Sequence, residues 1–124
     1  MISMLLVTSN KSRQLLYVSY SGQVGVEEIQ NSFADLKTQL GELSSGFRLL
    51  ADFSRLESMG LDCVLALGRM MDLIGEAGVD LVVRVIPDPG KDIGMNILTL
   101  FHYPHRPRIV ICKDMNEAAR ALAL

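Results

Sequence analysis

Two hydrophobic periodicities alternate along this chain of 124 residues, and their alternation limits the fold more than any other feature. Short apolar runs rich in leucine and valine, such as "FRLLADFS" and "DLVVRVIP", are typical of strands. The longer segments between such runs place apolar residues three or four positions apart, as amphipathic helices do. Strands that alternate with helices in this way predict an α/β fold with a mostly parallel sheet.

The chain begins with two strand-like runs, "SMLLVTS" and "QLLYVSYSG", separated by the polar "NKSR". This pattern predicts an antiparallel hairpin. We expect Lys11 and Arg13 in its exposed turn. Among its buried residues we expect Leu6, Leu16 and Val18.

The rest of the chain predicts four helices and three strands, so that the full order is β-β-α-β-α-β-α-β-α. A first helix is expected at 25–43, with one apolar stripe formed by Ile29, Phe33, Leu36, Leu40 and Leu43. Further helices are expected at 61–78, closed by Gly78, at 91–103 and at 114–124. Asp114 would cap the last helix, with Glu117 three positions on as in a capping box. The strand "PRIVICK" is expected to be buried.

Composition limits the class of protein. A hydrophobic content of 49% with 21% charged residues excludes a disordered chain, and the length suits a single domain over residues 1–124. A net charge of -2 gives no reason to expect nucleic acid or an anionic membrane as a partner. The first residues have neither the basic start of a signal peptide nor the length of a membrane span, so we expect a cytoplasmic protein.

Residues that could carry catalysis or metal binding are scattered. Cys63 and Cys112 lie inside apolar runs, as buried reduced thiols do. His102 and His105 are three positions apart, but prolines interrupt any helix that would align them for zinc. Gly90 and Lys91 do not form a phosphate-binding loop, because the rest of that motif is missing. We therefore expect no enzyme, no metal and no cofactor.

The order of elements, the "SGQV" that ends the second strand, the "LLADFSRLESMGLDCVLALGRMM" segment and the closing "MNEAARAL" together resemble a STAS domain of the anti-sigma factor antagonist family. This resemblance covers nearly the whole chain. It implies a mixed, mostly parallel sheet with helices. It also implies a regulatory protein that docks on a serine kinase or anti-sigma factor, or on other STAS-like subunits.

In that family the turn before the second helix reads Asp-Ser-Ser/Thr-Gly, and a partner kinase phosphorylates the second hydroxyl. Here Glu57, Ser58, Met59 and Gly60 take these places, so the acceptor hydroxyl is missing. The resemblance thus implies a docking module without the phosphorylation switch. Ser58 is suited to cap the following helix, and this interpretation is favoured over a shifted phosphorylation site. An acidic residue such as Glu57 near the start of a helix commonly interacts with the positive end of the helix dipole, and this interpretation is favoured. The alternative is that Glu57 supplies a constant negative charge in place of a phosphate.

The predicted helix at 61–78 is too apolar for one buried stripe. At about 100° per residue, Asp62, Arg69, Asp72 and Glu76 fall within an arc of roughly 80°. An opposite, buried side would be formed by Cys63, Val64, Leu67, Met71 and Ile74. Leu65 lies inside the polar arc, and Leu73 and Met70 lie on or near its flank. Either neighbouring helices cover these residues, or they form an interaction surface.

Three functions remain open. The first is a noncatalytic regulatory module that docks on a protein through the turn and the exposed edge of this helix: Glu57, Ser58, Met59, Gly60, Asp62, Leu65, Arg69 and Leu73. The second is a domain that binds a small apolar ligand or a nucleotide in a cavity beneath the helices. The third is a homo-oligomeric scaffold, such as a homodimer, that uses the same apolar surface.

Overall fold

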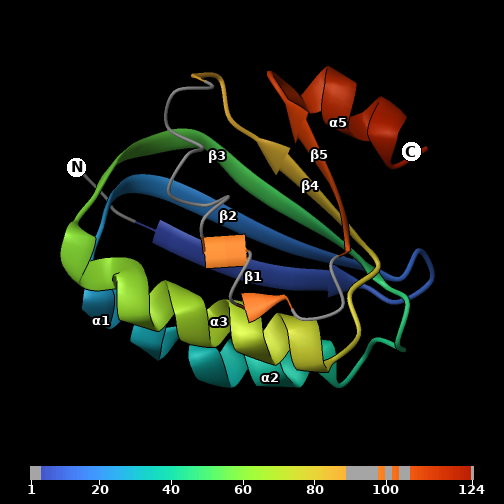
Figure 1. The fold of residues 1–124 in the computed structure, drawn as a ribbon, viewed down its shortest axis with the longest axis horizontal. Coiled ribbons are helices and arrows are strands. Elements are labelled where there is room, and N and C mark those ends of the chain that lie inside the picture. Colours follow the sequence, from blue (N-terminus) through green and yellow to red (C-terminus); the bar gives the residue numbers. More distant parts are fainter. Residues whose placement is uncertain (1–3, 89–97, 100–101, 104–106, 124) are drawn as a thin grey trace.

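A five-stranded sheet forms the centre of the molecule in the computed structural model, which describes residues 4–88, 98–99, 102–103 and 107–123 (Figure 1). Its strands follow the chain in the order β1-β2-β3-β4-β5. Their bounds are β1 Met4–Asn10, β2 Leu15–Val24, β3 Arg48–Met59, β4 Leu81–Val85 and β5 Arg108–Cys112. The pair β1 and β2 is antiparallel, and every later pair is parallel. The predicted α/β fold class is confirmed.

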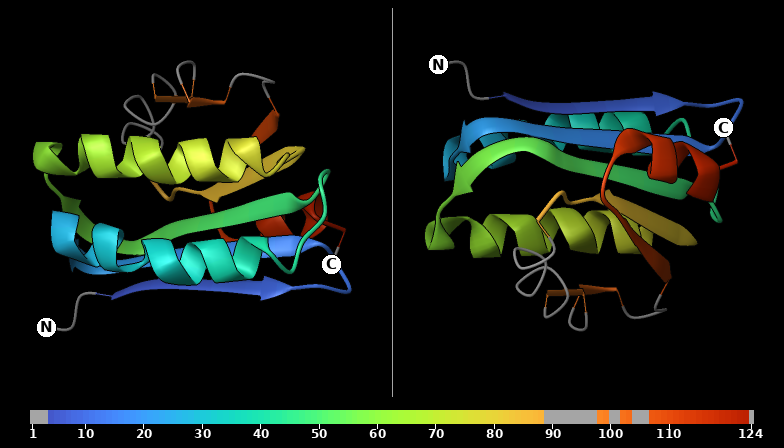
Figure 2. Two further views of the ribbon diagram at one scale, coloured as in Figure 1. Left: turned by 90° about the horizontal axis from the view of Figure 1, so that it is seen from below. Right: turned by 90° about the horizontal axis from the view of Figure 1, so that it is seen from above.

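Helices cover the two faces of the sheet unequally. One face carries α1 (Val26–Asn31), α2 (Phe33–Leu40) and α3 (Val64–Glu76), and the other carries α5 (Met115–Ala121), as the two views in Figure 2 show. Successive side chains of a strand point to opposite faces. In β2, Leu16 and Val18 therefore belong to the core under α1 to α3, whereas Leu15 belongs to the smaller core under α5.

The hairpin forms as predicted, with one correction. Leu16 and Val18 are buried, and Lys11 and Arg13 are exposed in the turn. Leu6, however, is 45% exposed. It lies on the face opposite its neighbours Leu5 and Val7, and α5, which contacts β4 and β5, does not cover it.

The helix expected at 25–43 is divided in two at Ser32. Its hydroxyl donates a hydrogen bond of 2.6 Å to the carbonyl oxygen of Ile29, so the side chain competes with the regular helical pattern. α2 ends at Leu40, so Leu43 lies beyond the helix, but the expected apolar stripe still faces one core. Ile29 and Leu36 are fully buried, and the other members of the stripe pack against the same core.

One predicted strand needs correction, and one predicted helix lies mostly outside the described residues. β5 is not a buried strand: it ends the described sheet, and Val110 and Ile111 are 36% and 39% exposed. Of the helix expected at 91–103, the described residues Leu98, Thr99 and His102 are helical. The rest of that helix, together with Gly90, Lys91 and His105, lies outside the described residues.

The last helix begins at the predicted residue. Asp114 caps α5 by accepting a hydrogen bond of 2.9 Å from the backbone N–H of Glu117. The carboxylate of Glu117 reaches back to the N–H of Lys113, one residue before the cap, again at 2.9 Å. The two bonds together satisfy two backbone donors, as a capping box does.

Candidate functional site

The residues predicted to form a turn before α3 belong instead to the end of β3. Ser58 and Met59 pair with Gln23 and Val24 of β2, so the strand extends to Met59. The N-cap of the short 3-10 helix Leu61–Cys63 is Gly60, and no side chain caps it or α3. The prediction that Ser58 caps the helix is therefore wrong. The pairing of β3 with β2 has two register shifts. The pattern of apolar and polar residues within β3 alone does not show how far such a pairing extends.

These two register shifts give β3 its shape. Between Asp52 and Arg55, and again between Leu56 and Ser58, β3 has one residue more than the paired stretch of β2. Extra residues of this kind bend a strand and increase its twist. The pairing of β3 with β4 ends at Asp52. Because β4 ends at Val85, the partner of Asp52, the last part of β3 extends beyond the end of β4.

Gly60 is the residue at which the chain leaves β3. A side chain at this position would start 2.5 Å from the carboxylate oxygen Oδ1 of Asp62, closer than such atoms normally approach. The chain then enters the 3-10 helix and α3 at once. As a result, Glu57 and Ser58 are exposed at the end of the sheet and Met59 is partly buried.

An apolar ridge follows Gly60. It consists of Leu61, Val64 and Leu65, which are 91%, 40% and 86% exposed. Sequence reasoning identified Leu65, placed Val64 on the buried side, and did not consider Leu61. Three exposed aliphatic side chains within five positions form a patch of the kind that marks a protein contact. Asp62 is exposed beside this ridge, and Arg69 is exposed farther along α3.

The middle of α3 differs from its start. Leu73 is partly buried and packs against the main core, and Met70 is 2% exposed. Met70 was expected on the flank of the polar arc, but its sulfur accepts a hydrogen bond of 3.4 Å from the hydroxyl of Tyr20. The ring of Tyr20 in turn stacks on Phe53, with 4.4 Å between the ring centres. Leu65 is therefore exposed on α3, whereas the side of the helix that carries Met70 is buried.

Beneath the middle of α3 lies a buried arginine that sequence reasoning missed. Arg84 lies in β4, is 1% exposed, and donates a hydrogen bond to the hydroxyl of Thr99. Burial raises the pKa of the nearby Tyr103 to about 12, and the Arg84 charge lowers it in part. The one signal in the sequence is a charged residue inside the apolar run "DLVVRVIP". The cavity that Arg84 and Tyr103 line measures only about 20 Å³, so it holds little more than a water molecule.

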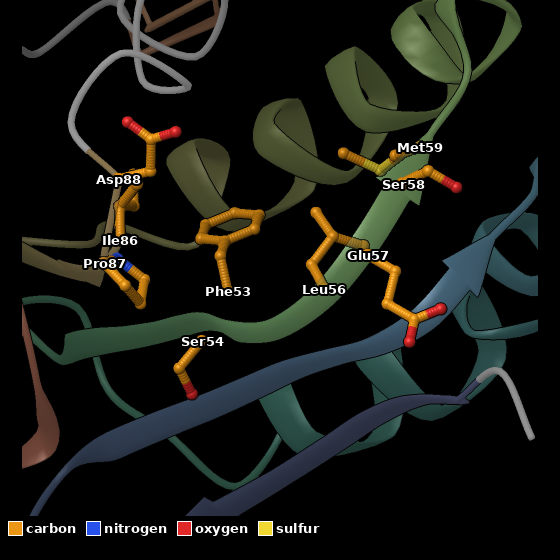
Figure 3. A pocket seen from close by; sticks show the side chains of 9 residues that line it. All are labelled: Phe53, Ser54, Leu56, Glu57, Ser58, Met59, Ile86, Pro87 and Asp88. Carbon is orange, nitrogen blue, oxygen red and sulfur yellow. The ribbon is translucent and has the colours of Figure 1, made fainter.

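A larger pocket opens where β3 and β4 separate. It has a volume of about 460 Å³ (Figure 3). Apolar lining comes from Phe53, Leu56, Met59, Ile86 and Pro87. Polar lining comes from Ser54, Glu57, Ser58 and Asp88. The pocket thus lies at the carboxyl ends of two parallel strands, where open α/β sheets commonly bind ligands.

Both cysteines are free thiols, and both are buried. Burial raises the pKa of the Cys63 thiol, and the neighbouring Asp62 carboxylate raises it further, so this thiol stays protonated and unreactive. Burial likewise raises the pKa of the Cys112 thiol. Among the residues that the structure describes, no three histidine, cysteine or carboxylate side chains come together to hold a metal.

His102 makes a structural contact with α3. Its Nδ1 atom lies 2.8 Å from a carboxylate oxygen of Asp72. A Cβ atom added to Gly68 would lie only 2.8 Å from the imidazole, so the ring lies directly against the backbone of α3. This contact ties His102 to the middle of the helix.

Comparisons with known proteins agree with this architecture. An uncharacterized protein of the DUF3478 family with a SpoIIAA-like fold, from Shewanella loihica PV-4, is 14% identical over 98% of this chain and 96% of its own, with a TM-score of 0.76. The anti-sigma factor antagonist SpoIIAA in its unphosphorylated form is 19% identical over 99% of this chain and 100% of its own, with a TM-score of 0.58. An anti-sigma factor antagonist from Mycobacterium paratuberculosis is 18% identical over 99% of this chain and 96% of its own, with the same TM-score of 0.58.

At the level of sequence, no family model and no curated protein matches the chain. Within the described residues, no helix has both the length and the apolar character needed to cross a membrane. Identities below one fifth carry information on the fold and not on residue roles. The protein therefore has a SpoIIAA-like fold, in agreement with the predicted order of strands and helices.

Proposed function

We propose that this protein is a noncatalytic regulatory module that docks on a partner protein through the apolar ridge at the start of α3. The single observation that carries the proposal is the exposure of Leu61 and Leu65, at 91% and 86%. Exposed leucines gain free energy when a partner removes them from water. The fold shared with anti-sigma factor antagonists supports a partner of the serine kinase or anti-sigma factor class, or another STAS-like subunit.

The residues around the ridge suit such an interface. Glu57, Ser58 and Asp62 are exposed beside it and supply a polar rim. Interfaces commonly combine a small apolar centre with a polar, solvent-accessible rim. Met59 and Gly60 connect the rim to the ridge. Arg69 is exposed on the same helix, whereas Leu73 packs against the core and is the least suited of the eight predicted residues to meet a partner. We further propose that residues 1–124 act as a single domain in the cytoplasm.

The test is a double charge substitution on the ridge. Leu61→Glu with Leu65→Glu should leave the melting temperature nearly unchanged, since both side chains are exposed, and should abolish capture of the partner from an extract of the source cells. Ala34→Glu with Ala121→Glu is the matched control, because these exposed alanines lie on α2 and α5 and add the same charge. A ridge variant that melts normally and still captures every partner of the parent protein would rule the proposal out. Light scattering on both variants separates a different protein partner from a second copy of this chain.

We propose in addition that docking is not controlled by phosphorylation at the position that Met59 occupies. Methionine has no hydroxyl to accept a phosphate, and Ser58, although exposed, is one residue earlier. Incubation with the captured kinase and ATP should leave the protein unmodified. Phosphate mapped to Ser58 by mass spectrometry would contradict this part of the proposal.

A second candidate function, binding of a small apolar ligand, is favoured by one observation. The pocket between the ends of β3 and β4 has a volume of about 460 Å³, within the usual range for small-molecule sites. It does not lie beneath the helices as expected, where the described cavity is only about 20 Å³. Because Met59 lines the pocket and directly precedes Gly60 and Leu61, a ligand there would touch the edge of the docking surface.

A further inference from the structure

The outer edge of β1 is open to pairing with a further strand. β1 is the first strand of the sheet, and among the described residues its strand partner is β2 alone. It lies at the outer border of the molecule in both views of Figure 2. Every residue from Met4 to Asn10 pairs with β2 without a register shift, so β1 is regular. Alternate backbone N–H and C=O groups of an edge strand point away from its neighbour and can bond to another strand.

β1 also lacks the side chains that commonly prevent such pairing. Edge strands of monomeric proteins are usually protected by charged residues, by proline or by a bulge. The sequence of β1, MLLVTSN, has no charged residue and no proline. The opposite edge of the described sheet differs, because β5 begins with the exposed Arg108 and is followed by the exposed Lys113. Of these two edges, β1 is therefore the better suited to pair with another strand.

One face of β1 is apolar and exposed. Met4 and Leu6 are 49% and 45% exposed. They point to the same face, because side chains alternate along a strand. α5 lies on this side of the sheet, but it contacts β4 and β5. A strand added beside β1 would remove part of both side chains from water.

We propose that β1 pairs antiparallel with β1 of a second copy of this chain, so that the two sheets join into one. In the proposed register, Leu6 lies opposite Leu6 of the second copy, and residues 4–8 of both chains pair. Leu5 then lies opposite Val7 of the second copy on the face that α1 and α2 cover. Met4 lies opposite Thr8 of the second copy on the face that carries Leu6.

A second copy suits this edge for two reasons. The register brings apolar residues together on both faces of the joined sheet, and such cross-strand pairs stabilise a sheet. Because β1 is uncharged, no like charges meet across the contact. Two identical antiparallel strands are also related by a two-fold axis, so the contact closes into a dimer. The pairing uses no residue of the apolar ridge and does not depend on the proposed docking function.

The first experiment measures association. Sedimentation equilibrium of the purified chain over a range of concentrations should give the mass of two chains. Leu6→Lys places two ammonium groups opposite each other and should weaken the dimer about tenfold or more. Met115→Lys is the matched control and should leave the dimer intact, because Met115 is 44% exposed but lies on α5. A monomeric parent protein, or a Leu6→Lys variant that dimerises as tightly as the parent, would overturn the proposal.

The ridge variant separates this dimer from docking on a partner. Leu61→Glu with Leu65→Glu should remain a dimer, because both residues lie outside β1. Loss of the dimer in this variant would place the contact on the ridge and overturn the β1 pairing. Capture of a partner protein by the ridge is a separate readout, so either proposal can fail without the other.

A cross-link tests the register and does not require Leu6→Lys to fold. Leu6→Cys places two thiols on directly opposite residues, whose Cα atoms are about 4.5–5.5 Å apart in antiparallel pairs and can carry a disulfide. Thr8→Cys is the matched control on the same face, since its two copies would lie roughly 13 Å apart along the strands. The native Cys63 and Cys112 are buried.

Mild oxidation should therefore give a covalent dimer of Leu6→Cys and little of Thr8→Cys. Equal yields from the two variants, or no covalent dimer of Leu6→Cys, would overturn the proposal.

Discussion

Two leucines on α3, Leu65 and Leu73, show how differently the two parts of one helix are used. The helical period places Leu65 inside the polar arc and Leu73 beside it. From the sequence alone, both side chains are therefore expected to be similarly exposed. In the structure, Leu65 is 86% exposed and Leu73 packs against the main core. The start of α3 projects its apolar residues into water, whereas the middle of the helix lies over Tyr20, Phe53 and the β4 strand. Packing by neighbouring elements, and not periodicity, decides burial at the flank of a helix.

The largest expected effect concerns the middle of α3. Leu67 is 3% exposed and lines the small cavity under the helix. Leu67→Ala should lower the free energy of unfolding by about 2–5 kcal/mol, because it removes buried methyl groups and leaves a void. Urea denaturation measures the loss. A change as small as that of an exposed residue would show that the middle of α3 is not the packed half of the helix.

The tyrosines beneath the middle of α3 make the same region sensitive to alkaline pH. Burial raises the pKa of Tyr103 to about 12, and burial likewise raises the pKa of Tyr20. The folded protein therefore keeps these protons at pH values where the unfolded chain, with an ordinary tyrosine pKa of about 10, releases them. The stabilisation is fully present below about pH 10 and is lost as the pH rises toward 12, by about 1.4 kcal/mol per pH unit for each tyrosine.

Urea unfolding at several pH values above about 9 measures this slope. Tyr103→Phe should reduce the slope by the share of one tyrosine. If the parent and the variant lose stability equally with rising pH, Tyr103 is not protected from water by α3 and its surroundings.

A smaller effect is expected at the contact between α3 and His102. Gly68→Ala places a Cβ atom 2.8 Å from the imidazole, so the ring must move at a cost of about 1–3 kcal/mol. The higher helix propensity of alanine offsets up to about 1 kcal/mol of this loss in the free energy of unfolding. In a His102→Ala background the same substitution should be neutral or stabilising. A double-mutant cycle from melting curves gives the coupling, and additive effects would contradict the contact.

The smallest expected effect is at the start of α3. Leu65→Ala should change the free energy of unfolding by less than about 0.5 kcal/mol, because the side chain already lies in water. Urea denaturation beside Leu67→Ala provides the direct contrast between the two parts of the helix. A loss of several kcal/mol at Leu65 would mean that this residue is covered, and the docking ridge would then not exist in solution.

The candidate site could be predicted only in part. The resemblance pointed to the segment from Glu57 to Gly60, and the angular pattern identified Leu65. Leu61 and Val64 were missed, because their exposure follows from where the chain leaves β3 at Gly60 and not from the helical period. The pocket was expected beneath the helices, since nothing in the sequence shows that β3 extends beyond the end of β4. Arg84 was missed because a buried charge needs partners that lie far away in the chain.

By itself, the sequence determined the features that arise from neighbouring residues. The polar "NKSR" between two apolar runs specified the hairpin, the stripe from Ile29 to Leu43 specified the helical layer, and Asp114 specified the start of the last helix. Only the tertiary structure decided which strand ends a sheet and which surface a helix leaves uncovered. It left Leu6 and β5 exposed, extended β3 to Met59 and buried Met70. These outcomes depend on pairing and packing between residues far apart in the chain, which a local pattern of apolar and polar residues does not encode.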